Sequence, residues 1–94
     1  MTETVVVKGR FDVNNRDDVK AEIDRVLAAG AQSVVIDLRA VEFMDSAAMA
    51  VLVAALTACR RAGGQASLVL PEREEARRVL ALTRFDKVFP VVEG

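Results

Sequence analysis

Asp45 and Ser46 are the two residues of this sequence whose types and position favour chemistry. They stand at the head of an almost unbroken apolar run, FMDSAAMAVLVAAL, at positions 43–56. Asp and Ser are both strong helix N-caps, because their side-chain oxygens accept hydrogen bonds from amides of the first helical turn. A phosphate on Ser46 would add almost two negative charges at the positive end of the helix, where the helix tolerates them. The pair is therefore interpreted as a cap, as a modification site, or as both.

A catalytic role for Ser46 has little support in the sequence. The chain contains no His, which removes the usual general base and the commonest metal ligand. There is no Lys beside the motif and no Gly-x-Ser-x-Gly elbow, the turn that exposes the nucleophile in serine hydrolases. A hydrolase using Ser46 with Asp45 nearby is the weakest alternative, and we expect no enzyme activity.

Size and composition indicate one small globular domain, expected to span 1–94. The chain has 94 residues, 52% of them hydrophobic, and a net charge of -1. This balance of charge is unlike that of proteins that bind nucleic acid directly, which carry a basic surface. The N-terminus lacks the pattern of a secretory signal, and the longest apolar run, 47–56, is well short of the roughly 20 residues of a membrane helix. We therefore expect a cytoplasmic protein without membrane insertion.

Strand-like and helix-like patterns alternate along the chain. Strands are predicted at 4–8, 33–38 and 66–70, with 33–38 buried on both faces. Helices are predicted from a cap at Asn14 or Asn15 to Gly30, then at 46–62 and 72–82. Residues 9–15 and 39–43 are expected to be connections, and Pro90 makes the tail, 88–92, an edge or a cap. This order predicts an α/β fold with a mostly parallel, mixed sheet of about four strands and helices packed against it.

The helix after Ser46 has no polar face for two turns, from 47 to 55. A helix that is apolar all round is normally buried all round. A domain with one sheet and three helices has too little mass to bury such a helix completely. We therefore expect part of it to face a partner.

Four segments in this order resemble the STAS domain, in particular the bacterial anti-sigma factor antagonists. They are VKGRFD at 7–12, SVVIDLRAVEFMDSAAM at 33–49, RRAGGQASLVLP at 60–71 and LALTRFDKVFPVV at 80–92. Each motif alone is weak, whereas their order and spacing are specific. The resemblance covers nearly the whole chain and implies a single STAS-like domain.

The resemblance implies a partner-switching module that acts in transcription regulation. In that family the unmodified antagonist binds an anti-sigma factor, a serine kinase of the GHKL type, and so frees a sigma factor. The kinase phosphorylates the serine after the motif aspartate, which ends the complex, and a PP2C-type phosphatase reverses the step. Matched by position, Ser46 is the phosphoacceptor and Asp45 the motif acid. ATP and magnesium belong to the partner kinase, so this chain is expected to need no cofactor or metal.

The implied partner surface combines a loop and the start of a helix. The loop through Asp12 and Asn14 contributes one part, and the other consists of Asp45, Ser46, Ala47, Ala48 and Met49. Two of these positions depart from the family pattern. The family usually has Gly at position 48, where a methyl group would weaken or redirect docking, and often a second hydroxyl at position 47.

Two further expectations follow from the same resemblance. Many relatives carry an additional strand before 4–8, and its absence would expose a sheet edge that invites pairing, which leaves a homodimer open. Small STAS proteins also resemble a structural subunit of lipid-trafficking ABC transporters, in which no switch operates. Ala47 and Ala48 keep this alternative open.

Overall fold

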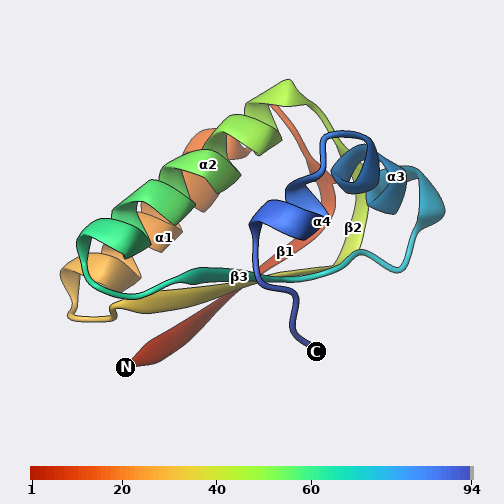
Figure 1. The fold of residues 1–94 in the computed structure, drawn as a ribbon. Coiled ribbons are helices and arrows are strands. Elements are labelled where there is room, and N and C mark those ends of the chain that lie inside the picture. The colour runs from red at the N-terminus through yellow and green to blue at the C-terminus, as the bar shows by residue number, and fades with distance from the viewer. Residues whose placement is uncertain (94) are drawn as a thin grey trace.

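Three parallel strands form the frame on which the helices are arranged (Figure 1). The computed structural model describes residues 1–93, and within them the strand order is β1-β2-β3. The strands are β1 (Thr2–Phe11), β2 (Ser33–Met44) and β3 (Ala66–Val69). Parallel neighbours require crossover helices. The alternation of strand and helix was predicted from the sequence and is confirmed.

The two crossover helices lie side by side across one face of the sheet (Figure 1). They are α1 (Arg16–Ala28) and α2 (Ser46–Arg61). α1 buries Ile23 and Val26, so one stripe of an otherwise polar helix faces the sheet. α2 buries a wider stripe, which consists of Ala48, Val51, Leu52, Ala55, Leu56 and Cys59.

Large apolar side chains from every layer meet in one core beneath α1 and α2. Phe11, Ile36, Leu52, Leu68 and Leu80 belong to its fully buried members. Each such side chain contributes roughly 1.5–3 kcal/mol relative to an exposed position. The head of α2 is therefore fixed by core packing directly below it.

The C-terminal part adds α3 (Glu74–Leu82) and α4 (Phe85–Val88). The prediction that the third helix starts at residue 72 was wrong. The Glu72 amide donates to the Arg39 carbonyl at 3.2 Å instead and stays outside the helix. The tail was expected to be extended from residue 88, which was wrong at its start, because Val88 is the last residue of α4. Beyond the helix, a Leu68–Val91 bridge pairs the tail with the outer edge of β3, consistent with the edge position expected from Pro90.

Two segments that were predicted to be connections belong to strands in the structure, so these predictions were wrong. Residues 39–43 continue β2 to Met44, and residues 9–11 continue β1 to Phe11. They pair with each other, but the register shifts between Val6 and Lys8 and again between Gly9 and Arg10. These bulges interrupt the two-residue alternation by which strands are recognised.

The sheet differs from the expected one in two further respects. Within residues 1–93 it has three strands rather than about four, and all pairs are parallel rather than mixed. Burial of β2 on both faces was also overestimated, since Val35 is only half-buried. On β1, Val6 alternates with buried Val5 and Val7 and is 56% exposed, so it points to the face opposite the core.

Candidate functional site

Asp45 joins the start of α2 to the loop that follows β1. As the N-cap of α2, it accepts a hydrogen bond from the Ala48 amide through Oδ1 at 3.0 Å. Its other oxygen, Oδ2, accepts from the Val13 amide at 3.1 Å. Donation by the amide of Ala48 and, to a lesser degree, of Val13 and Ala47 lowers the pKa of Asp45. The carboxylate is therefore ionised near neutral pH and holds two distant segments together.

Asp12 organises the loop from within. Its side chain is buried, and Oδ1 accepts from the Asn14 amide at 2.9 Å while Oδ2 pairs with Arg10 Nε at 3.1 Å. Asn15 Oδ1 accepts from the Asp12 amide at 2.9 Å, and Asn15 Nδ2 donates to the Arg10 carbonyl at 2.8 Å. Asn15 occupies the N-cap position of α1, but its side chain makes no capping bond. The predicted capping residue therefore stands at the start of α1, but the predicted side-chain hydrogen bond to the helix is not formed.

Ser46 is the first residue of α2 and is exposed. The prediction that Asp45 caps this helix is confirmed. The prediction that Ser46 also caps it was wrong. Asp45 alone supplies the capping bond, because Ser46 follows the cap and already lies inside the helix. Within residues 1–93 the hydroxyl of Ser46 has no hydrogen-bond partner. It is free for chemistry that leaves the cap intact.

Apolar and cationic side chains lie on the segments that adjoin this serine: the loop held by Asp45, the end of β2 and the first turn of α2. Val13 at the loop tip is 62% exposed, and Met49, one turn into α2, is half-buried. Phe43, at the end of β2, is 39% exposed and carries the Arg10 guanidinium 4.1 Å above its ring. The hydroxyl therefore stands among exposed apolar groups, as at a protein-binding surface.

Residues 1–93 contain no group of three or more His, Cys, Asp or Glu side chains placed to hold a metal ion. None of the helices formed by these residues has the length and apolar character needed to cross a membrane.

Comparison with known proteins decides the family. The model of the STAS domain matches residues 3–93. The chain belongs to the STAS domain family. A STAS-domain containing protein of Pseudomonas aeruginosa is 32% identical over 90 residues, which cover 94% of this chain and 85% of that protein.

Solved structures agree with this assignment. A proposed anti-sigma factor antagonist of Thermotoga maritima has a TM-score of 0.83 at 28% identity, over 97% of this chain and 80% of that one. An anti-sigma factor antagonist of Mycobacterium paratuberculosis has a TM-score of 0.82 at 31% identity, over 97% and 76%. A sulfate transporter family protein of Wolinella succinogenes, with a TM-score of 0.73 at 20% identity over 96% and 75%, shows the fold alone.

Ala48 lies inside this STAS domain and not on its surface. Its side chain is 0% exposed and belongs to the hydrophobic core, below the cap formed by Asp45. The sequence suggested that a methyl group here would weaken docking. The methyl group is not on the accessible surface of the domain, and an effect of Ala48 on docking stays a prediction. Among the other positions of the expected surface, Asp12 is buried, Ala47 is half-buried and Asn14 is exposed.

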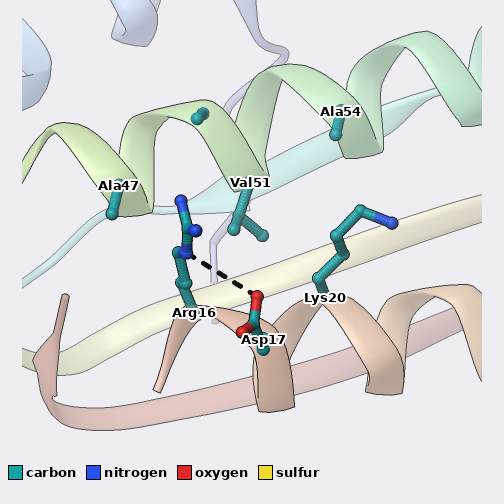
Figure 2. Close-up of a pocket in the computed structure, with 7 residues that line it drawn as sticks. Arg16, Asp17, Lys20, Ala47, Val51 and Ala54 are labelled. Atoms are coloured by element: carbon teal, nitrogen blue, oxygen red, sulfur yellow. Dashed lines mark ion pairs between the residues drawn. The ribbon is translucent and has the colours of Figure 1, made fainter. Parts of the chain in front are cut away.

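A hollow of about 290 Å³ lies between α1 and α2 of the STAS domain and is lined on α2 from Ala47, the residue after Ser46 (Figure 2). Small apolar side chains of α2 form one wall, and charged side chains of α1 form the other. In Figure 2 the Arg16 guanidinium reaches from α1 toward α2 near Ala47. The lining residues are Arg16, Asp17, Lys20, Ala47, Ala50, Val51 and Ala54.

The outward face of α2 continues from Ser46 along the helix. Ala50 and Val53 are exposed, and Val53 retains 46% of its accessible surface. The sequence predicted that part of this apolar helix would lie outside the core, which is confirmed. That a partner covers this face stays a prediction.

Val13, Phe43 and Arg16 belong to the site but were not predicted from the sequence. The sequence signal that could have indicated Val13 is an apolar residue within the polar segment DVNNRDD. Phe43 was read as part of a connection. Arg16 is far from Ala47 in sequence, and only the packing of α1 against α2 brings both to the lining of one hollow.

Proposed function

We propose that this STAS domain is an anti-sigma factor antagonist that acts by partner switching. Unmodified, it binds an anti-sigma factor of the GHKL serine kinase type and frees a sigma factor for transcription. Phosphorylation of Ser46 releases the kinase, and a PP2C-type phosphatase restores the complex. The kinase brings ATP and Mg²⁺, and the antagonist supplies the acceptor hydroxyl.

The observation that carries the proposal is the separation of the hydroxyl from the cap. Ser46 is exposed and follows an aspartate whose two oxygens already accept amide hydrogen bonds at 3.0 and 3.1 Å. A kinase can therefore modify Ser46 without breaking either bond. The phosphate would also stand at the positive end of α2, so the helix itself would not be destabilised.

The same phosphate acts differently on a bound partner. A protein docked on Val13, Ala47 and Met49 covers the hydroxyl of Ser46 as well, since Ala47 and Met49 follow Ser46 in the first turn of α2 and the Val13 amide is bonded to Asp45, the residue before it. Covering a phosphate requires removal of its hydration, which is costly unless the partner supplies opposite charge. Phosphorylation therefore opposes the complex while leaving the antagonist folded. The relatives of known structure described as anti-sigma factor antagonists support this assignment.

Parallel pull-downs from native lysate test the proposal. The baits are wild type, Ser46→Asp and Thr57→Asp, with mass spectrometry as the readout. Thr57 is an exposed hydroxyl residue on the same helix, three turns from the cap, and controls for added charge. We expect wild type and Thr57→Asp to retain a GHKL-type kinase and Ser46→Asp to lose it, with unchanged circular dichroism. The purified kinase with ATP and Mg²⁺ should then phosphorylate Ser46 alone.

Two results would contradict the proposal. Retention of the kinase by Ser46→Asp would show that charge at this position does not govern the complex. Capture of one transporter ATPase by all three baits would instead identify a non-switching STAS subunit of a lipid-trafficking transporter, in which Ser46 has no switching role.

A further inference from the structure

Arg16 on α1 and Ala47 on α2, the residue after Ser46, line the same hollow. Arg16 lines it together with Ala47 and Ala50. Ser46 stands four residues before Ala50, so the two side chains share one face of α2. Helical side chains tilt toward the helix N-terminus. A group attached to Ser46 Oγ therefore lies at the end of the hollow where α2 begins.

The start of α1 lies at this same end. The Val13 amide donates to Asp45 at 3.1 Å, and the Arg16 amide donates to the Asp12 carbonyl at 2.9 Å. These bonds hold the first residues of both helices next to each other. Figure 2 shows the Arg16 side chain extending from α1 across the hollow toward Ala47, the residue that follows Ser46.

Arg16 is held more loosely than the neighbouring cations. Within residues 1–93 it makes one ion pair, Nε to Asp17 Oδ1 at 3.6 Å, and the two side chains are 47% and 88% exposed. Such exposed pairs contribute little. Lys20, by contrast, pairs with Asp24 at 2.8 Å, and Arg10 is engaged by both Asp12 and Phe43.

We propose that Arg16 captures the phosphate of phosphorylated Ser46 within the same chain. The inference rests on the proposed function, since it concerns the phosphorylated form. The guanidinium leaves Asp17 and forms a charge-assisted pair with two phosphate oxygens, the geometry that Arg favours. Its aliphatic stem then covers Ala47 and Ala50. Phosphorylation thus adds charge and also closes part of the apolar surface that a partner needs.

Phosphorus NMR on a chain with phosphoserine installed at position 46 by semisynthesis tests this pairing. A nearby guanidinium favours the doubly charged phosphate, so its loss raises the titration midpoint of the phosphorus signal. For a pair about 4 Å apart in a high-dielectric setting, we expect Arg16→Gln to raise the midpoint by about half a pH unit. Arg16→Lys should recover about half of that shift.

Two variants control for general changes in the local field. Lys20→Gln removes the other cation of the hollow, and Arg25→Gln removes one near the far end of α1. The remaining charged groups around the phosphate are Asp45 on α2, Asp12 and Arg10 at the end of β1, and Asp17 on α1, all unchanged throughout. We expect both controls to move the midpoint by less than about one tenth of a unit.

The proposal is overturned if Arg16→Gln leaves the midpoint unchanged, or if Lys20→Gln shifts it equally. Because the phosphoserine is installed chemically, the result does not depend on whether any kinase modifies Ser46. A shift specific to Arg16 supports the pairing even if the pull-downs contradict partner switching. An absent shift refutes the pairing even if the switch is established.

Discussion

Replacing Ala48 with Gly separates a role in stability from a role in docking. The resemblance to anti-sigma factor antagonists implies Gly at this position, so the substitution introduces the residue expected there. The side chain of Ala48 is 0% exposed and lies in the core. Ala48→Gly should therefore destabilise the domain and leave the affinity for the kinase unchanged.

The expected magnitude has two parts. Ala to Gly within a helix costs about 1 kcal/mol through helix propensity, and removing one buried methyl group costs about 0.8 kcal/mol. The sum is about 1.5–2 kcal/mol. Ala50→Gly, on the same helix but exposed, should cost only the first part, about 1 kcal/mol.

Urea denaturation of the three proteins measures these values directly. With a slope of about 1 kcal/mol per molar urea, the midpoint of Ala48→Gly should fall by about 1.5–2 M. Its melting temperature should fall by about 6–16 °C. A titration of the kinase into the folded proteins completes the comparison. Equal stability of Ala48→Gly and Ala50→Gly would refute the assignment of the methyl group to the core. A large gain in affinity for the proposed kinase in Ala48→Gly would show that the methyl group of Ala48 obstructs docking.

Two further predictions concern the cap and the turn after α2. The lowered folded-state pKa of Asp45 means that its contribution to stability is present above the ordinary carboxyl pKa and is lost as pH falls through the folded value. The difference in unfolding free energy between wild type and Asp45→Asn should therefore be larger at about pH 6 than at about pH 3 in urea titrations, and a gap that widens in acid would contradict the charge-assisted cap. A Cβ at Gly64 would overlap the Gln32 carbonyl oxygen and Ser33 Oγ, so Gly64→Ala should cost about 2–3 kcal/mol in the same assay. Gln65→Ala, at the exposed neighbouring residue, should stay within about 0.5 kcal/mol of wild type, and two equal effects would argue against close packing at Gly64.

The strands and helices could be predicted largely because their apolar periodicity is local. The end of β2 could not be predicted, because Arg39, Ala40 and Glu42 show no alternation of apolar and polar residues typical of a strand. They are held extended by pairing with β1, where Lys8 faces Ala40 and Phe11 faces Met44 after two register shifts. A bulge changes which side chains face the core, and only the partner strand reveals it.

The site shows the same division between local and distant information. The position of Asp45 as a cap follows from its place before an apolar helix, and this was predicted. Its second bond, to the Val13 amide, spans 32 positions in the sequence. Proximity of this kind depends on the packing of α1 and α2, which no local pattern contains. For the same reason Arg16 could not be associated with Ser46 before the helices were placed.

The two hydrogen bonds of the Asp45 carboxylate have a consequence for how a domain of this kind distinguishes one partner from another. Asp12 and Asp45 are committed to hydrogen bonds that hold the loop after β1 and the start of α2, so substitutions there disturb the fold. Val13 and Ala50 are exposed and make no comparable contribution to the fold. If the proposed partner switch operates, duplicated copies of such a domain within one cell can diverge at Val13 and Ala50 and acquire separate kinases while retaining the same scaffold. A few exposed side chains then limit binding to the wrong partner, and these side chains can change with little loss of stability.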